Sequence, residues 1–253
     1  MIAYVDELVT LHHGRYEDVL PSIEGADLAI VDPPYGDTSL DWDRLDLDWL
    51  PTVSAALQPH GSIWLWGSLR YLMAAVPAAL EAGWAVSQDI VWEKHNGSGS
   101  FADRFRRVHE HAVMLYRGKW VDVYADPQYS KDATPRRVRR KQRPAHWGDI
   151  GEHAYRSEDG GPRLLRSVMF ERSAHGSAIH PTQKPLGVTR TLIQYSCPPG
   201  GLVVDPYAGS ATTLVAARMC GRRAVGCEVN GEYVDRAVRR LGHAPLPLEG
   251  AAP

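Results

Sequence analysis

Four consecutive residues, Asp32-Pro33-Pro34-Tyr35, combine groups that could hold an amine carried by a flat ring. They follow the apolar run 27–31, which has the length and composition of a buried parallel strand. The prolines lack N–H groups, so the chain is expected to leave the sheet here with Asp32 and Tyr35 at the carboxyl end of the strand. The carboxylate and backbone carbonyls can accept hydrogen bonds from an exocyclic amine, and the Tyr35 ring can stack on the flat ring that carries this amine. A plain strand-to-turn exit uses the same residue types, so this stretch alone leaves both interpretations open.

A second stretch with chemical content is 203–213, which reads Val-Val-Asp-Pro-Tyr-Ala-Gly-Ser-Ala-Thr-Thr. It predicts a strand, a turn of small residues and a helix start, where the backbone can approach a nucleoside-containing ligand. Asp205 at the turn would repel a phosphate and attract an ammonium group. Glu228, after the next predicted strand, is placed to accept ribose hydroxyls. A cofactor with an amino-acid end and a ribose fits these groups, and S-adenosylmethionine is such a cofactor.

The elements that must position these residues alternate between strands and helices, which predicts an α/β fold with a mostly parallel sheet. Strands are expected over 7–12, 27–31, 62–66, 86–92, 111–116, 202–204 and 224–227. Helices are expected over 45–57, 71–82, 188–196, 212–219 and 232–241. The glycine-rich stretch 95–100 predicts an irregular, mobile segment. From 117 to 179 no period is clear, which predicts an insertion outside the main sheet.

The composition is that of an ordinary globular protein, with 253 residues, 44% of them hydrophobic, and a net charge of −2. No apolar run reaches membrane-spanning length and the first residues lack a signal-peptide pattern, so we expect a cytoplasmic enzyme that does not contact a membrane. Neither the three cysteines nor the eleven histidines show metal-ligand spacing. No metal is therefore expected.

Positive charge is concentrated in one part of the chain. From Lys94 to Arg143 there are thirteen Lys and Arg residues against five Asp and Glu. The densest run contains Arg136, Arg137, Arg139, Arg140, Lys141 and Arg143. Such a run is either a solvated loop or an arm that contacts phosphates. Its confinement to one segment of a mildly acidic chain favours contact with nucleic acid.

Three motifs in one order resemble the β-group of amino-directed DNA methyltransferases, which methylate adenine N6 or cytosine N4. They are Asp32-Pro-Pro-Tyr35, then 180–185 (His-Pro-Thr-Gln-Lys-Pro), then 205–210 (Asp-Pro-Tyr-Ala-Gly-Ser). The resemblance covers most of 7–242 and weakens over 117–179. It implies a Rossmann-like, circularly permuted methyltransferase sheet of seven strands in the order 3-2-1-4-5-7-6. The first predicted strand would be strand 3, the strand before Asp32 strand 4, and the strand before Asp205 strand 1.

The resemblance also implies a division of the chain and a role for each motif. Its parts would be a catalytic half over 1–116, a target-recognition insertion over 117–179, a cofactor-binding half over 180–242 and a flexible tail over 243–253. The catalytic residues would be Asp32, Pro33, Pro34 and Tyr35. The residues holding S-adenosylmethionine would be Thr182, Lys184, Asp205, Pro206, Tyr207, Ala208, Gly209, Ser210, Thr212 and Glu228. Of these, Thr182 and Lys184 match the family's contacts to the methionine end of the cofactor.

The implied reaction is methyl transfer to an exocyclic amino nitrogen of double-stranded DNA whose target base is flipped out of the stack. The Asp32 carboxylate and the Pro33 carbonyl would accept hydrogen bonds from the amine, and Tyr35 would replace the lost stacking. An initial Asp is more typical of adenine N6 enzymes and Ser of cytosine N4 enzymes, so adenine N6 is favoured and cytosine N4 is the alternative. Methylation of cytosine C5 is excluded because it uses a Pro-Cys thiolate, which this chain lacks. The motif order argues against RNA and protein amide methyltransferases.

A different class, a catalytically inactive DNA-binding relative, stays open because two positions depart from the family pattern. Ala211 stands where the family usually has Gly. Arg15 stands where it usually has an Asp near the adenine of the cofactor. A homodimer and a cognate restriction endonuclease are both compatible with the resemblance, and the sequence decides neither.

Overall fold

The structure is a computed structural model that describes residues 1–37, 40–98, 103–140, 153–174 and 178–243. It divides into two compact units, one formed by 1–126 together with 167–253 and the other by 127–166. The expected tail, 243–253, lies outside the described residues except for His243. Among the described residues, no helix is both long enough and apolar enough to cross a membrane.

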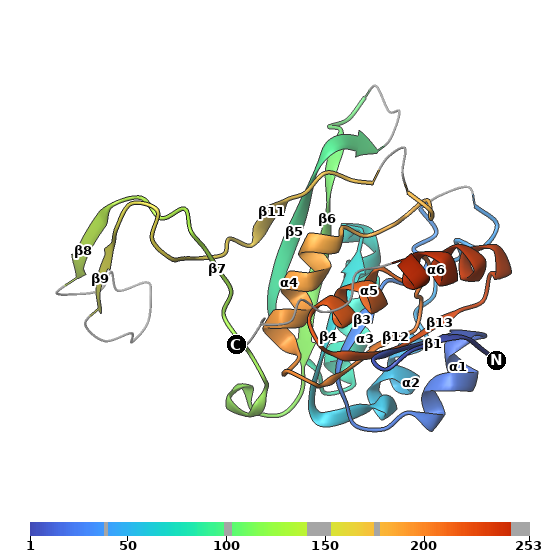
Figure 1. Cartoon of the computed structure of the whole chain (residues 1–253). Coiled ribbons are helices and arrows are strands. Elements are labelled where there is room, and N and C mark those ends of the chain that lie inside the picture. Colours follow the sequence, from blue (N-terminus) through green and yellow to red (C-terminus); the bar gives the residue numbers. More distant parts are fainter. Residues whose placement is uncertain (38–39, 99–102, 141–152, 175–177, 244–253) are drawn as a thin grey trace. The chain divides into compact units, whose positions relative to one another are not determined.

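The larger unit is built on a nine-stranded sheet (Figure 1). Its strands are β1 (Ile2–Val5), β2 (Val9–His13), β3 (Ala26–Val31), β4 (Leu57–Gly67), β5 (Ala85–Ser98), β6 (Arg107–Tyr116), β11 (Val168–Phe170), β12 (Leu202–Asp205) and β13 (Arg223–Glu228). Their order is β1-β2-β13-β12-β3-β4-β6-β5-β11. The strands from β2 to β4 are parallel neighbours, and β6 is antiparallel to both β4 and β5. From β2 to β5 this is the expected order 3-2-1-4-5-7-6, so the predicted α/β methyltransferase sheet is confirmed.

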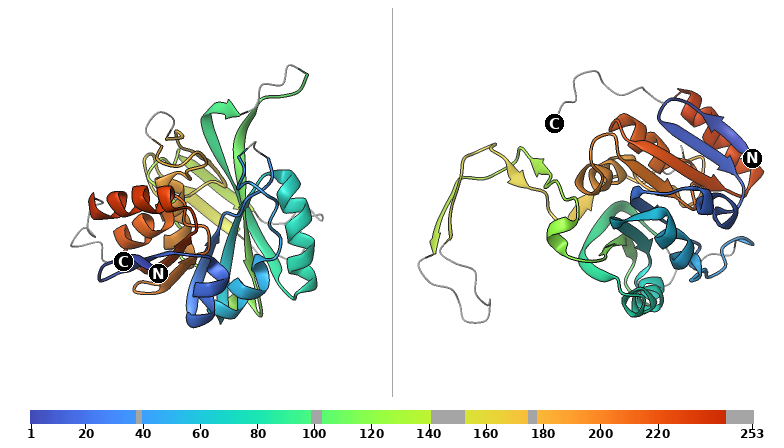
Figure 2. Two further views of the ribbon diagram at one scale, coloured as in Figure 1. Left: turned by 90° about the vertical axis from the view of Figure 1, so that its right-hand side faces the viewer. Right: turned by 90° about the horizontal axis from the view of Figure 1, so that it is seen from below.

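Helices cover both faces of this sheet (Figure 2). They are α1 (Tyr16–Val19), a 3-10 turn η1 (Leu20–Ser22), α2 (Trp49–Ala56), α3 (Leu69–Glu81), a 3-10 turn η2 (Trp120–Asp122), α4 (Leu186–Ser196), α5 (Thr212–Met219) and α6 (Gly231–His243). Successive residues of a strand point to opposite faces. In β3, Leu28 and Ile30 therefore join the core beneath α4, α5 and α6, while Ala29 and Val31 join the core beneath α1, α2 and α3. Burial on both faces explains why this strand reads as a continuous apolar run.

Three local predictions differ from the structure. The helix expected over 45–57 begins only at Trp49, and β4 begins at Leu57. The segment 117–179 is not wholly outside the main sheet, because β11 pairs in parallel with β5 at its edge. Within the stretch 95–100, expected to be irregular, residues 95–98 belong to β5, but the pairing of β5 with β6 is irregular between Glu93 and Ser98; residues 99 and 100 lie outside the described residues.

The pairing of β5 with β6 is interrupted within that glycine-rich stretch. Glu93 pairs with His109 and the next pair is Ser98 with Arg107, so the register shifts between them. At Gly97, an added Cβ would lie 2.3 Å from Cγ of Arg106, so the glycine leaves room for that side chain to cross the strand. A glycine inside a strand often marks such a bulge and such a close approach.

The smaller unit, 127–166, contains two antiparallel pairs: β7 (Tyr129–Ser130) with β10 (Arg163–Leu164), and β8 (Arg136–Arg140) with β9 (His153–Ser157). It is narrower than the expected insertion, since 117–126 and 167–179 belong to the larger unit. The basic run begins in β8, where Arg136 and Arg137 are exposed. Lys141 and Arg143 lie outside the described residues.

Candidate active site

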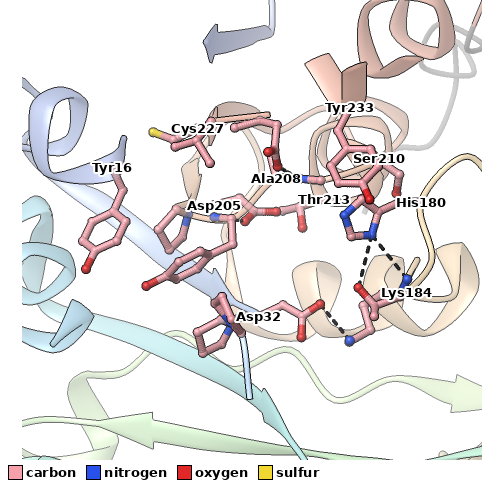
Figure 3. Close-up of a pocket in the computed structure, with 18 of the residues that line it drawn as sticks. Tyr16, Asp32, His180, Lys184, Asp205, Ala208, Ser210, Thr213, Cys227 and Tyr233 are labelled. Carbon is pink, nitrogen blue, oxygen red and sulfur yellow. Dashed lines mark hydrogen bonds and ion pairs between the residues drawn. The ribbon is translucent and has the colours of Figure 1, made fainter. Parts of the chain in front are cut away.

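The two sequence motifs meet because β3 and β12 are parallel neighbours. Asp32 follows the last residue of β3 and Asp205 is the last residue of β12, so their carboxylates lie at the same edge of the sheet. A cavity of about 250 Å³ opens at this edge, and both carboxylates line it (Figure 3). All of the predicted catalytic and cofactor-binding residues line the same cavity: Asp32, Pro33, Pro34, Tyr35, Thr182, Lys184, Asp205, Pro206, Tyr207, Ala208, Gly209, Ser210, Thr212 and Glu228. The predicted DNA-contacting arginines 136, 137, 139 and 140 belong to β8 of the smaller unit.

Asp32 has a partner on each of its carboxylate oxygens. The hydroxyl of Tyr35 donates to Oδ1, and Nζ of Lys184 lies 2.7 Å from Oδ2. Burial raises the pKa of Asp32 above its ordinary value, and the positive charge of Lys184 opposes that rise. The carboxylate is therefore fixed in orientation, and the adjacent cation favours its charged form.

Lys184 lies between two carboxylates. Its Nζ is 3.1 Å from Oε2 of Glu110, and Glu110 forms a further ion pair with Lys94. Burial acts to raise the pKa of Glu110, but the two lysines overcome it and the pKa falls to about 2. Burial acts to lower the pKa of Lys184, but Asp32 and Glu110 overcome it and the pKa rises. Positive and negative charges thus alternate from Lys94 to Asp32, which compensates each charge withdrawn from water.

Glu110 and Lys94 have no motif to mark them in the sequence. Each is one of several charged or polar residues in its part of the strand, so residue type alone does not distinguish it. The structure brings them together because β5 and β6 are antiparallel, with Trp92 opposite Glu110. Lys184 is thereby joined to the catalytic motif, in addition to lining the cavity that would hold the cofactor.

Aromatic rings surround the Asp32 side of the cavity. Nζ of Lys184 lies 5.6 Å from the ring centre of Tyr35 and 5.6 Å from that of Trp66. The ring of Tyr35 is tilted against that of Tyr71, with 5.1 Å between their centres. Flat faces beside a carboxylate acceptor suit a planar base that carries an amine.

The Asp205 side of the cavity has the donors and acceptors expected for S-adenosylmethionine. Burial raises the pKa of Asp205 to about 7, although Thr213 and the backbone N–H of Tyr207 donate to its carboxylate. Burial also raises the pKa of Glu228, whose oxygens accept the N–H groups of Gly209 at 2.8 Å and Asn230 at 2.7 Å. Two carboxylates in one half of a cavity disfavour a phosphate and favour an ammonium and hydroxyl groups. The residues present therefore fit this cofactor.

The turn between β12 and α5 requires two residues with positive φ. Gly209 has φ 49° and Ala211 has φ 57°, and Ala211 is the one non-glycine residue with positive φ in the part of the chain that the structure describes. The left-handed conformation destabilises a residue with a Cβ by about 1–2 kcal/mol, which explains why glycine is the usual residue there. Arg240 braces the turn by donating to the carbonyl of Ser210 at 2.9 Å and to Oγ1 of Thr212 at 2.8 Å.

Three aromatic side chains cluster at the rim of the cofactor side. The ring of His180 lies 4.2 Å from that of Tyr233 and 5.5 Å from that of Trp42, measured between ring centres. Burial, reinforced by the positive charges of Lys184 and Arg236, lowers the pKa of His180 to about 4. His180 is thus neutral near pH 7. Its Nδ1 lies 3.1 Å from Oγ1 of Thr182.

Trp42 and Tyr233 have no place in the motifs and become part of the cavity only in the folded chain. Arg15, the other departure from the family pattern, also lines the cavity, with its guanidinium 2.6 Å from Glu17. Among the described residues, no cluster of three or more His, Cys, Asp or Glu side chains could hold a metal ion.

Comparison with known proteins agrees with this geometry. A family model described as DNA methylase matches residues 26–239. The Type II methyltransferase M1.MboII of Moraxella bovis is 26% identical over 254 residues, which covers 91% of this chain and 95% of that protein. The crystal structure of the M1.HpyAVI–SAM complex gives a TM-score of 0.64 at 22% identity and covers 92% of this chain and 99% of that one. The PvuII DNA methyltransferase, titled cytosine-N4-specific, gives a TM-score of 0.68 at 16% identity. The alignment covers 100% of this chain and 90% of that one. At these identities the solved structures show a shared fold.

Proposed function

The chain belongs to the family of N6- and N4-directed DNA methylases, and from this we propose that it methylates N6 of adenine in double-stranded DNA. S-adenosylmethionine is the methyl donor of this family. The observation that carries the proposal is the single cavity that Asp32 lines on one side and Asp205 and Glu228 line on the other. A methyl donor and an amino group held in one cavity can react without a covalent intermediate.

The cofactor would be held by Asp205 at its ammonium and by Glu228 at its ribose hydroxyls. When bound, S-adenosylmethionine supplies an electrophilic methyl group on a sulfonium. Asp205 and Glu228 orient the donor, and most of the rate is expected to come from holding the two reactants in line. The small residues of the turn at 208–211 let the backbone approach the ligand.

Asp32 would act on the amine of the target base. The lone pair of an exocyclic amine is delocalised into the ring, which makes the nitrogen a weak nucleophile. Hydrogen bonds from its two N–H groups to Asp32 and to the Pro33 carbonyl would favour a more pyramidal nitrogen with an available lone pair. Each carboxylate oxygen of Asp32 can accept a further hydrogen bond beside its present partner. Lys184 keeps this acceptor charged, and the target base must leave the DNA stack to reach it.

The choice of adenine rests on the initial Asp of the catalytic motif, and cytosine N4 is the alternative. Incubation of the protein with S-adenosylmethionine and genomic DNA, followed by nucleoside mass spectrometry, tests the choice directly. N6-methyladenine is expected, and N4-methylcytosine alone would overturn it. If no base is methylated, titration with S-adenosylmethionine decides whether the chain is an inactive relative. Sequencing of the modified bases also gives the recognition sequence.

Replacing Asp205 or Glu228 with alanine should weaken S-adenosylmethionine binding by about 10-fold or more. The expectation follows because each carboxylate would make charge-assisted hydrogen bonds, worth about 1.5–3 kcal/mol apiece. Isothermal titration calorimetry measures the affinities. Glu81, an exposed glutamate of α3, provides the matched control, and its alanine variant should bind as the wild type does.

The pH dependence of S-adenosylmethionine binding distinguishes the contribution of Asp205 from that of Glu228. Because the pKa of Asp205 is about 7, a falling pH protonates it and removes the charge that attracts the ammonium. Affinity should therefore decrease as pH drops from 8 to 6, by at most about tenfold per unit. The Asp205→Asn variant should show no such dependence. Unchanged affinity in both alanine variants would mean that the cofactor binds elsewhere.

Neutralising the arginines 136, 137, 139 and 140 of β8 should weaken DNA binding on every sequence. Cations facing phosphates release counterions, so each lost contact should reduce the slope of log affinity against log salt by about 0.9. The methylated sequence should stay the same, because phosphate contacts position a protein and base contacts choose the site. We expect other side chains in 144–179 to make the base contacts that select the sequence.

A salt titration of DNA binding, paired with the methylation pattern of the variant, measures both effects. An unchanged slope would mean that β8 does not contact DNA. A changed recognition site would mean that these arginines also read bases.

A further inference from the structure

β5 and β6 form a hairpin that extends past the sheet edge where Asp32 lies. β4 ends at Gly67, and Gly67 pairs with His111 of β6. Since β6 is antiparallel to β4, the residues that precede His111 lie beyond the carboxyl end of β4. Pairing between β5 and β6 nevertheless continues to Ser98 and Arg107. Figure 1 shows this hairpin projecting beyond the rest of the sheet.

The projecting part is braced from one side. β11 pairs with β5, placing Met169 opposite Trp92, and the indole of Trp92 donates to the carbonyl of Glu171 at 2.8 Å. Further out, the hydroxyl of Ser173 donates to Oδ1 of Asn96 at 2.9 Å. These contacts lie within the larger unit and attach the outer part of β5 to the segment 168–173, while the pairing of β5 with β6 is irregular between Glu93 and Ser98.

The end of the hairpin presents an aromatic ring among arginines. We call residues 103–107, which read Asp-Arg-Phe-Arg-Arg, the hairpin tip. Phe105 is 102% exposed, the highest value among the exposed large hydrophobic residues that the structure describes. The tip carries three arginines against one aspartate. Single exposed apolar side chains are common on protein surfaces, so the significance of Phe105 comes from its place among arginines and from its position relative to the proposed base pocket.

The hairpin tip lies close to the proposed base pocket. Glu110 contacts Lys184, which contacts Asp32. From Glu110 to Phe105 is five residues, which span at most about 17 Å of extended chain. Arg107 also pairs with Asp37, on the loop that follows the catalytic motif, at 3.2 Å.

These features point to one partner, the DNA duplex around the target base. Guanidinium groups match phosphates, and an aromatic ring matches the faces of bases. Aromatic and arginine side chains are also enriched in protein interfaces, but the position of the tip near the cavity proposed to receive a flipped base favours DNA.

We propose that Phe105 enters the base stack and fills the space left by the flipped target base, while Arg106 contacts a flanking phosphate. Apolar side chains inserted into a duplex are an established way to stabilise an unstacked state. The inference rests on the proposed function. It assigns Phe105 a positioning role, in which it holds the duplex open and does not touch the reacting atoms.

The experiment compares two substrates that contain the recognition sequence found with the wild-type protein. One is the intact duplex, and the other has an abasic site opposite the target base, so that flipping breaks no base pair. Phe105→Ala should lower kcat/KM on the intact duplex by about 10-fold, the size expected for one lost aromatic stacking contact. On the abasic substrate the loss should be much smaller, and Phe105→Trp should restore activity on both. Met73, 71% exposed on α3, provides a control whose alanine variant should leave both rates unchanged.

A fluorescent 2-aminopurine at the target position gives a second readout. Its fluorescence rises when the base leaves the stack, and Phe105→Ala should reduce that rise at saturating protein. Arg106→Gln should lower the salt slope of binding by about 0.9.

Full activity of Phe105→Ala on the intact duplex would overturn the inference, as would an equal loss on both substrates. An unchanged salt slope for Arg106→Gln would remove the phosphate contact assigned to that residue. A wild-type protein that methylates no DNA would remove the proposed function itself. The results are therefore distinguishable.

Discussion

Replacing Asp32 with alanine is expected to lower kcat for methyl transfer by at least about 100-fold, the usual effect of removing one preorganised hydrogen-bonding group from an active site. The amine would lose the acceptor that localises its lone pair. Affinity for S-adenosylmethionine should change little, because the groups proposed to bind it are Asp205 and Glu228. Single-turnover methyl transfer and calorimetric titration of the same variant measure the two quantities.

Two further variants, one isosteric and one a control, complete this experiment. Asp32→Asn keeps the size of the side chain but removes its charge, so it should be nearly as slow as the alanine variant. Asp235, exposed on α6, is the matched control, and its alanine variant should react at the wild-type rate. An Asp32→Ala protein that kept more than about one tenth of wild-type kcat, a barrier change under about 1.4 kcal/mol, would show that another group accepts the amine.

Replacing Lys184 with methionine should affect both stability and catalysis. The side chain is 9% exposed and lies between the carboxylates of Asp32 and Glu110. Removing it leaves two carboxylates close together without their shared cation, and breaking a buried pair in this way costs about 3–5 kcal/mol. Unfolding by denaturant at pH 7 measures the loss.

The pH–rate profile of the same variant reports on Asp32. Burial raises the pKa of Asp32 and Lys184 opposes the rise, so the pKa should climb further without Lys184. In the proposed mechanism Asp32 acts as a carboxylate, so activity should be lost as pH falls through its pKa. The acid limb of kcat should therefore move to higher pH, and raising the pH should recover part of the activity. Lys184→Arg, which keeps the charge, should leave the limb in place. A methionine variant with wild-type stability and an unmoved acid limb would contradict the proposed role.

Much of the fold and the main elements of the cavity follow from local sequence patterns. Apolar runs bounded by prolines and glycines predict where strands end, and the alternation with helices predicts that the strands are parallel. The carboxyl ends of neighbouring parallel strands lie at one edge of a sheet. Two motifs at such ends, Asp32 and Asp205, were therefore predictable as one site, and the permuted motif order predicted which strands would be neighbours.

Only the tertiary structure decided which side chains support that site. Glu110 and Lys94 come from strands whose pairing brings them to Lys184, and no residue near them in the sequence signals that contact. Trp42 and Tyr233 meet at His180 from distant segments for the same reason. Ion pairs and ring contacts depend on which strands and loops become neighbours, and that is a property of the whole chain.

The limits of local prediction are clearest at the β5–β6 hairpin. Glycine at 97 predicts an irregular loop, yet 95–98 belong to β5, whose pairing with β6 is interrupted after Glu93 and resumes at Ser98. Arg106 occupies the space that a Cβ at 97 would fill. β11 joins the sheet from a segment without clear periodicity because β5 has a free edge beside it. The chemistry of the motifs is thus determined locally by residue type. The support of Asp32 through Glu110 and Lys94 depends on cross-strand pairing, because strand formation depends more on a partner than on the residues of the strand itself.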